Sequence, residues 1–313
     1  EMILFFLISA FSSFYLTEKS LPYLYKWLPD IPNHRSSHNL PKPRGGGIFF
    51  ITIGLLLSLF QKKFLFLIFI PLAIISLIDD LKNIPSIYRF FVQFFTITIF
   101  LLNSSIVNLY LNNSPISLKL FIYFILIMFG TSIINFSNFM DGIDGILAGC
   151  MIILLTAQAI SNIPSLFPFI GALSGFLILN WPPAKIFMGD IGSSFLGALF
   201  ACSFFYLENA SQIIGILLIS TPLLGDAFIC LIRRYFSGCN IFKPHKMHLY
   251  QRLNQGGLSH KTISSIYIAE TLVLFFSYFY LPFVFLIILN LGVLLSGYFL
   301  DKKLAVPFSS LEG

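Results

Sequence analysis

Residues 135–145 bring polar side chains into a strongly apolar part of the chain, with the sequence NFSNFMDGIDG. The candidates for chemistry in this stretch are two amides and two carboxylates: Asn135, Asn138, Asp141 and Asp144. Three residues on a helix turn the side chain by about 60°, so Asn138 and Asp141 are neighbours. Gly142 and Gly145 weaken a helix, and a broken helix in a membrane protein is tolerated where it lines a polar cavity. The stretch therefore predicts a site for oxygen ligands, with a capping turn as the alternative.

Two further carboxylates, Asp79 and Asp80, end another apolar run, and Arg89 opens the next. Adjacent carboxylates at a membrane edge are costly, because each raises the pKa of the other unless a cation lies nearby. Such a pair could position a phosphate nucleophile or accept its proton. A solvated turn is the alternative.

Asp190 stands just before the apolar run that starts at residue 193. Gly189, Gly192 and Ser193 leave backbone donors open there, so one turn could hold both a metal ligand and a phosphate cradle. Lys185 lies shortly upstream and is a candidate for binding the substrate. The alternative is that Asp190 merely caps the helix.

Basic residues lie in two segments that join apolar runs. In residues 30–47, Gly45 to Gly47 are expected to expose backbone N–H groups beside Lys42 and Arg44, which suits an anion. Residues 243–253 contain His245, Lys246 and His248. No third soft ligand accompanies the two histidines, so contact with phosphate is favoured over metal binding. The alternative for both segments is contact with lipid headgroups.

The elements that position these groups are apolar helices. The chain has 313 residues, 57% hydrophobic, with a mean hydropathy of +0.88, which excludes an ordinary soluble domain. Runs of roughly 15 to 20 apolar residues predict eleven membrane spans. Their expected positions are 2–17, 46–60, 64–78, 88–103, 119–137, 146–160, 166–180, 193–207, 212–231, 263–280 and 282–300. We therefore predict a single all-α, polytopic membrane domain covering residues 1–313.

The distribution of Lys and Arg predicts the orientation of the chain. Of the 19 basic residues, all but Lys62, Lys63 and Lys119 fall in connections on one side of the predicted spans. The positive-inside bias makes that side cytoplasmic, with the N-terminus outside and the C-terminus inside. It also accounts for the net charge of +6 without any nucleic acid. Every polar cluster then faces the cytoplasm, which favours Mg²⁺-dependent chemistry on a phosphorylated substrate.

Six motifs in order resemble the polyprenyl-phosphate N-acetylhexosamine-1-phosphate transferases, also called glycosyltransferase family 4. They cover Asp30 to Leu253: the proline-rich motif at 30–47, the aspartate pair with Arg89 and Gln93, NxxNxxDGxDG at 135–145, PAKIFMGDxGS at 183–193, PxxxD with an arginine pair at 222–234, and HxxHLYQRL at 245–253. The likeness is closest to the short bacterial initiators of O-antigen and capsule synthesis. It extends over most of the chain.

The resemblance implies transfer of a sugar 1-phosphate from a UDP-N-acetylhexosamine to undecaprenyl phosphate, with release of UMP, at the cytoplasmic face of the bacterial inner membrane. It implies that Asn138 and Asp190 bind Mg²⁺, for which Mn²⁺ could substitute, that Asp79 and Asp80 lie at the lipid phosphate, that Asp141 lies near the nucleotide, and that His245 and His248 contact the diphosphate or sugar. Asp144 counts with the catalytic carboxylates, and Lys42, Arg44, Arg89, Asn135, Lys185, Ser193 and Lys246 with the substrate-binding groups.

Several alternatives stay open at this point. The product could serve O-antigen, teichoic acid or another wall polymer, and a homodimer is compatible with the sequence. An ion-coupled transporter would also need polar groups in broken helices, but near the midplane of the membrane. Asp226 and Glu270 lie inside apolar runs and have no assigned role beyond interhelical hydrogen bonding.

Overall fold

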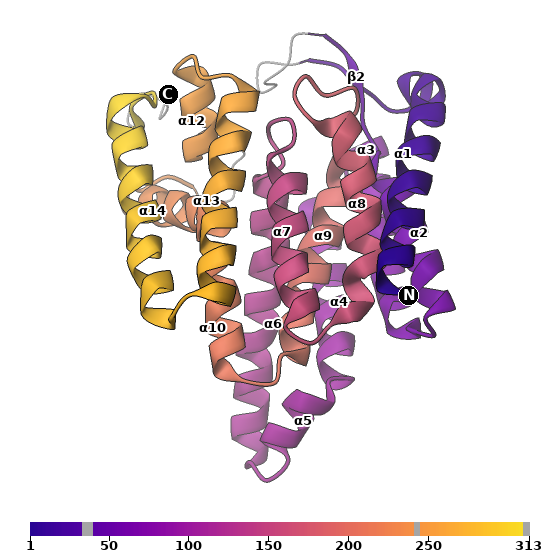
Figure 1. Cartoon of the computed structure of the whole chain (residues 1–313), viewed down its shortest axis with the longest axis vertical. Helices are drawn as coiled ribbons and strands as arrows, with labels where there is room; N and C mark the ends of the chain where they lie inside the picture. Colours follow the sequence, from indigo (N-terminus) through magenta and orange to yellow (C-terminus); the bar gives the residue numbers. More distant parts are fainter. Residues whose placement is uncertain (33–39, 241–244, 309–313) are drawn as a thin grey trace.

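The computed structural model describes residues 1–32, 40–240 and 245–308, and these form fourteen α-helices (Figure 1). Part of the 30–47 motif, residues 33–39, lies outside the described residues. The α-helices are α1 (Met2–Trp27), α2 (Gly47–Phe60), α3 (Ile70–Lys82), α4 (Ser86–Leu102), α5 (Ser105–Leu111), α6 (Ile116–Phe139), α7 (Ile146–Ile160), α8 (Phe167–Asn180), α9 (Gly189–Ser203), α10 (Ala210–Ile219), α11 (Asp226–Phe236), α12 (Leu249–Gln255), α13 (His260–Tyr280) and α14 (Phe283–Lys303).

Short elements complete the described fold. The strands β1 (Pro29–Asp30) and β2 (Lys42–Pro43) pair antiparallel at the end of α1. 3₁₀ turns precede α3 and α8 and follow α9, and one π-helical turn, Thr221–Gly225, joins α10 to α11. The prediction of an all-α domain is thus confirmed for the described residues, with the exception of this pair of two-residue strands.

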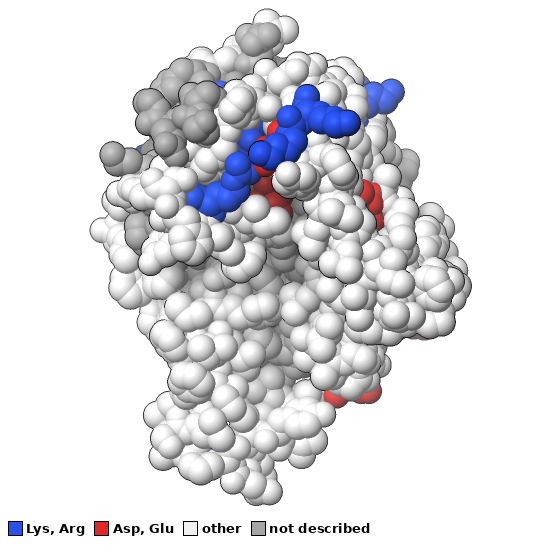
Figure 2. Space-filling model, turned by 90° about the vertical axis from the view of Figure 1, so that its left-hand side faces the viewer, with Lys and Arg blue, Asp and Glu red and all other residues white. Residues whose placement is uncertain are grey.

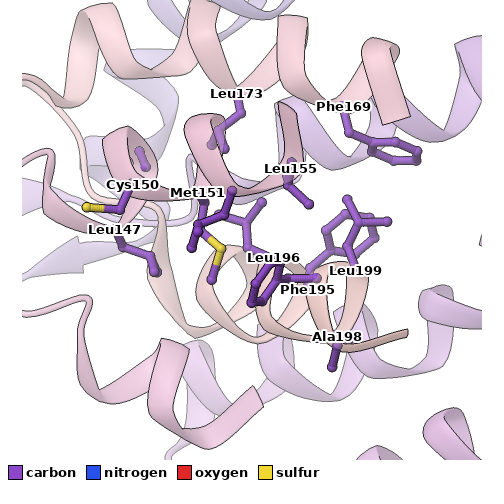
Figure 3. Close-up of a cluster of buried hydrophobic side chains, with 14 of the residues drawn as sticks. Leu147, Cys150, Met151, Leu155, Phe169, Leu173, Phe195, Leu196, Ala198 and Leu199 are labelled. Carbon is purple, nitrogen blue, oxygen red and sulfur yellow. The ribbon is translucent and has the colours of Figure 1, made fainter. Parts of the chain in front are cut away.

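Helix α9 is the centre of the bundle, in contact with α2, α3, α4, α6 and α7. Residues 191–203 of this helix are all buried. Its Gly, Ala and Ser side chains let neighbouring backbones approach closely, as is typical of helix interfaces in membranes. Figure 3 shows Phe195, Leu196 and Leu199 of α9 packed among side chains of α7 and α8. This packing fixes the N-terminus of α9, where Asp190 lies.

Helix α1 packs along α8 over much of its length. Two glycines of α8 spaced four apart, Gly171 and Gly175, make this contact close. A Cβ added to Gly175 would lie 2.0 Å from the carbonyl oxygen of Ala10, and one on Gly171 would lie 2.1 Å from Oγ of Ser9. The side of α1 that faces this groove carries buried Ser9 and Ser13. Small residues on both helices therefore replace bulky side chains at this interface.

The chain is a polytopic membrane protein, and helices occupy all eleven of the predicted segments. By length and composition, five described helices can cross a membrane, or seven if each bent pair counts as one span. The bent pairs are α4 with α5, at 71°, and α10 with the segment Thr221–Phe236, at 64°. Helices α2, α7 and α8 are apolar but shorter. Helices α7 and α8 are largely buried among other helices, so they need not match the bilayer thickness individually.

The charged and uncharged parts of the molecular surface lie at different heights along the long axis. Figure 2 shows Lys and Arg gathered in the upper part of one face, next to a small acidic patch, above an extended uncharged surface. Large apolar side chains such as Phe11, Leu118, Phe285 and Leu295 are exposed along the helices, as expected for contact with lipid. The C-terminal end of α14 lies at the upper end and the N-terminus in the lower half (Figure 1).

Candidate active site

The carboxylates predicted for catalysis meet at one end of the bundle, because three helices begin or end there. Asp79 and Asp80 lie in the last turn of α3, Arg89 in the first turn of α4, and Asp190 in the first turn of α9. Nη1 of Arg89 lies 2.8 Å from Oδ2 of Asp79 and also contacts Oδ2 of Asp190. The structure therefore brings together these four residues from separate sequence motifs.

Asp80 occupies the position that the sequence suggested for Asp190 or for a phosphate. Its buried carboxylate accepts the backbone N–H of Asp190 at Oδ1 and that of Ile191 at Oδ2, both at 3.1 Å. The first turn of α9 is thereby capped from α3, which suits the partial positive charge of a helix N-terminus. These two amides are therefore not open for a phosphate, and Asp190, whose alternative role was to cap this helix, is not the cap.

The glycine-rich segment after β2 does not expose its donors as predicted. The N–H groups of Gly46 and Gly47 donate to the carbonyls of Phe187 and Met188, both at 3.0 Å. The prediction of an open anion cradle is wrong for these two residues, because the segment pairs with the chain that leads into α9. Arg44 remains at the site: its Nη1 lies 3.8 Å from Oδ1 of Asp80, and its Nη2 donates to the Asp80 carbonyl.

The two amides of the 135–145 stretch lie on the last turns of α6. Nδ2 of Asn138 donates to Oγ of Ser193 at 2.9 Å, which leaves its Oδ1 without a donor among the described residues. Ser193 is completely buried and donates in turn to the Gly189 carbonyl at 3.3 Å, so its hydroxyl has an internal role. Nδ2 of Asn135 donates to Oε1 of Gln93 on α4 at 3.1 Å. Asn138 and Asp190 thus lie on helices that Ser193 holds together.

Asp141 follows the end of α6 and is surrounded by other acids. Burial and the nearby carboxylates of Asp190, Asp80 and Asp144 raise the pKa of Asp141 well above its usual range. Without Asp144, which has Lys42 beside it, the four carboxylates of Asp79, Asp80, Asp141 and Asp190 outnumber the guanidinium groups of Arg44 and Arg89 by two if all are ionised. The side-chain atoms that could bind a metal ion here are all oxygens. An excess of two negative charges among hard oxygen ligands fits a divalent cation such as Mg²⁺, which Asp190 and Asn138 would hold.

Asp144 has its own set of partners beside this cluster. Its Oδ2 accepts the N–H of Ala184 at 2.9 Å and lies 3.6 Å from Nζ of Lys42, while Oδ1 lies 3.4 Å from Nδ1 of His260. Burial alone would raise the pKa of Asp144, but the hydrogen bonds and charges of these partners lower it below its usual value. Nζ of Lys42 also lies over the ring of Phe187, 5.2 Å from its centroid. The carboxylate therefore ties three chain segments together.

His260 is a site residue that the sequence did not reveal. It opens α13, far along the chain from the motif it contacts, and it is preceded by an ordinary Ser259 cap. A lone histidine at a helix start has no spacing that relates it to Asp144. Lys185, by contrast, was predicted as a substrate-binding residue and is exposed, and its side chain forms no hydrogen bond or ion pair with the described residues.

The HxxH segment lies next to the end of α6. The ring of His248 lies 5.9 Å from that of Phe139, and Oη of Tyr250 donates to the Phe139 carbonyl at 2.8 Å. Burial, followed by the charges of His248 and Arg234, lowers the pKa of His245 to about 3, and burial with Arg234 lowers that of His248 to about 4. Burial also lowers the pKa of Lys246. Both imidazoles are therefore neutral at pH 7.

The expectation that no third soft ligand accompanies the histidines is wrong. Cys230 of α11 lies with them, and one ligand atom from each of the three residues falls within 4.8 Å of the others. All four cysteines of the chain are free thiols. Asp226, one turn before Cys230, is also nearby: its Oδ1 lies 3.9 Å from Nδ1 of His248.

Comparison with known proteins adds to this geometry. Residues 63–208 match the profile of Glycosyl transferase family 4. The chain is 30% identical over 308 residues to a phospho-N-acetylmuramoyl-pentapeptide-transferase of Streptococcus pyogenes, with 82% of this chain and 90% of the relative covered. It is 28% identical over 256 residues to a probable undecaprenyl-phosphate N-acetylglucosaminyl 1-phosphate transferase of Bacillus subtilis, covering 74% and 71%. A decaprenyl-phosphate N-acetylglucosaminephosphotransferase of Mycobacterium tuberculosis is 31% identical over 166 residues, 42% and 40% of the two chains.

Proposed function

Because the chain belongs to glycosyl transferase family 4, we propose that it transfers an N-acetylhexosamine 1-phosphate from a UDP-sugar to undecaprenyl phosphate and releases UMP. One observation carries this proposal: the carboxylates of α3 and α9 share Arg89 at the end of the bundle where Asn138, Asp141 and the basic residues Arg44 and Lys42 also lie. That arrangement offers cation ligands, guanidinium groups for phosphate and an apolar bundle beneath them for a lipid.

The reaction exchanges one phosphoanhydride linkage for another at phosphorus. An oxygen of the lipid phosphate attacks the phosphorus attached to the sugar, and the bond from that phosphorus to the bridging oxygen of the diphosphate breaks, so UMP leaves with that oxygen. A phosphate is already an anionic nucleophile, so direct attack needs only positioning and neutralisation of charge. Arg89 and Arg44 supply positive charge beside the carboxylates. No covalent enzyme intermediate is required.

A divalent cation held by Asp190 and Asn138 would neutralise charge on the diphosphate. The side chain of Asp190 is 37% exposed, the most accessible of the carboxylates in contact with Arg89. The amide oxygen of Asn138 has no donor from the described residues. One carboxylate and one amide oxygen suffice for Mg²⁺, which usually keeps waters and substrate phosphate oxygens as its other ligands.

We place the site at the cytoplasmic face of the bacterial membrane, with the N-terminus outside. The 16-to-3 division of Lys and Arg supports this orientation, and Figure 2 shows basic side chains collected toward one end of the molecule. The UDP-sugar would then be reached from the cytoplasm. A reporter fused after Gly313 is expected to be active only as a cytoplasmic fusion, and activity restricted to the periplasm would reverse the assignment.

The decisive experiment is an activity assay in purified membranes. Undecaprenyl phosphate is incubated with UDP-GlcNAc, other UDP-N-acetylhexosamines or UDP-N-acetylmuramoyl-pentapeptide, and UMP and the lipid-linked product are measured. The expected result is UMP release with a UDP-N-acetylhexosamine, as in the initiation of O-antigen synthesis. Product from UDP-N-acetylmuramoyl-pentapeptide alone would assign the chain to the reaction in the Streptococcus relative's name. No UMP with any donor would favour a transporter.

The metal assignment is tested by Mg²⁺ titration of two variants. Asp190→Ala is expected to abolish activity, and Asn138→Ala to raise the Mg²⁺ concentration for half-maximal rate by roughly tenfold or more. Asn113→Ala, in the exposed turn before α6, serves as the matched control. Normal rates with an unchanged Mg²⁺ requirement in both site variants would remove the pair from the metal site.

A further inference from the structure

A second ligand cluster lies beside the proposed transferase site and is of a different chemical kind. It consists of Cys230 on α11 with His245 and His248, whose ligand atoms lie within 4.8 Å of one another. The two imidazole rings are 5.0 Å apart between centroids. Cys230 and His248 are buried and His245 is partly buried. The transferase chemistry proposed above uses no thiol, so Cys230 has no place in it.

One nitrogen in this cluster lacks a partner. The side chain of His248 is only 4% exposed, and its Nδ1 has no hydrogen-bond partner among the described residues. The nearest acid, Asp226, lies 3.9 Å away through Oδ1. That carboxylate is held in place by the N–H of Leu249 at 2.7 Å and the hydroxyl of Tyr267 at 2.8 Å. A metal-bound histidine typically donates its second N–H to such a fixed carboxylate.

We propose that Cys230, His245 and His248 bind a zinc ion, or another thiophilic divalent cation, with Asp226 orienting His248 from behind. One thiolate and two imidazoles are typical zinc ligands, and three protein ligands leave a fourth position for water or a substrate oxygen. Zinc bond lengths place such ligand atoms roughly 3.3 to 3.6 Å apart, so the cluster closes by about one ångström when the ion binds. The site is separate from the oxygen ligands proposed for Mg²⁺.

Charge and access are compatible with this ion. Metal binding displaces the Cys230 proton, and the thiolate with Asp226 then supplies two negative charges that offset the dication beside the positive charges of Arg233, Arg234 and Arg252. The N–H of Met247 now donates to Nδ1 of His245 at 3.2 Å, and this single hydrogen bond is lost if that nitrogen binds the ion. Cys230 and Asp226 also line a cavity of about 450 Å³ between α11, α13 and α14, through which an ion can enter.

The ion would fix the segment that leads into α12 against α11. His248 is the N-cap residue of α12, and its ring lies tilted against that of Phe139, the residue after Asn138, so the clamp would also hold the end of α6. This role rests on folding of the chain and not on the transferase activity. The two proposals can therefore fail independently.

The test measures metal in the purified full chain by mass spectrometry and then replaces zinc with Co²⁺. We expect about one zinc per chain in the wild type and, with Co²⁺, the thiolate-to-metal absorption of a tetrahedral site. Cys230→Ser and His245→Ala are expected to lose at least nine-tenths of the bound metal. Cys239→Ser, which alters the other thiol of this region, is expected to keep it.

Two results would overturn the proposal. The first is that Cys230→Ser binds as much metal as the wild type. The second is that the wild-type Co²⁺ complex shows no thiolate absorption. The second needs no variant, so it decides even if Cys230→Ser folds poorly. UMP release with Mg²⁺ is recorded on the same samples: bound zinc without UMP release leaves this site standing, and UMP release without zinc leaves only the proposed function standing.

Discussion

Nη1 of Arg89 contacts the carboxylates of both Asp79 and Asp190, which arrive from α3 and α9. A single guanidinium therefore holds the proposed lipid-phosphate position next to the proposed metal position. A cation bound by Asp190 would weaken the contact between Asp190 and Arg89. The guanidinium of Arg89 would then be free to contact a phosphate. This makes Arg89 as informative to test as the acids themselves.

Arg89→Ala is expected to lower kcat by at least tenfold, because a positive charge is lost where two anionic substrates must meet. Arg89→Lys keeps the charge but not the forked donors, so it is expected to recover part of the rate. Steady-state kinetics with lipid phosphate as the varied substrate make this measurement. Lys82→Ala, at the exposed end of α3, is the control. Equal rates for all three variants would show that Arg89 only neutralises its neighbours.

Asp79→Asn and Asp80→Asn are expected to differ in stability although both lose activity. Asp80 is buried and accepts two N–H groups of α9, so its amide variant loses charge-assisted bonds worth about 1.5–3 kcal/mol. Asp79 accepts one amide, from Ile84 in the turn after α3. Thermal unfolding in detergent should show the larger fall in Tm for Asp80→Asn. A larger fall for Asp79→Asn would contradict the capping role of Asp80.

His260→Ala is expected to weaken the Asp144 junction in a pH-dependent way. The folded-state pKa of Asp144 is lowered by its partners, so its ionisation stabilises the fold above the ordinary aspartate value of 3.8, and that stabilisation is lost as pH falls through the lowered pKa. The variant should therefore unfold a few degrees below the wild type at pH 7, with the gap narrowing below about pH 4. Lys261→Ala is the neighbouring control. A gap that stays constant with pH would mean that His260 acts only by packing.

Gly47→Ala is expected to damage the site without touching any catalytic group. A Cβ at Gly47 would lie 2.6 Å from both Cα and N of Gly192, backbone atoms that cannot rotate away. The substitution should push α2 from the first turn of α9 and lower activity by roughly tenfold or more, as small shifts of catalytic groups do. Gly292→Ala in α14, where nothing lies within 4 Å, should be neutral. Full activity of Gly47→Ala would mean that this contact does not position Asp190.

The positions of the candidate catalytic acids were predictable because each one interrupts or borders an apolar run. Asp79, Asp80, Asp141 and Asp190 are conspicuous in sequence for this reason, and all of them lie at the same end of the bundle. The same logic located the helices. Apolar runs do not give the number of helices that span the membrane, because composition cannot show whether a short apolar helix such as α7 faces lipid or other helices.

Partnerships between distant segments were not predictable in the same way. Glycines at 45–47 looked like open donors, but whether an N–H is free depends on which strand lies opposite, and here the opposite segment is 187–188. Asp80 caps a helix more than a hundred residues away, and Cys230 joins two histidines only because α11 turns back toward α12. Local patterns carry no information on such encounters, which depend on how the helices pack.

The α1–α8 interface has a consequence for biogenesis. About 140 residues separate the end of α1 from the start of α8, so at roughly 5–20 residues per second α1 is made about 7 to 28 seconds before its partner. During that interval the buried hydroxyl of Ser13, which later faces the glycine groove, has only lipid, the insertion machinery or other early helices to contact, whereas that of Ser9 can donate to the Phe6 carbonyl of its own helix. The polar side of α1 must therefore be kept out of the lipid in some other way at first. Assembly around α9 can finish only after α8 has been made and covers that side of α1.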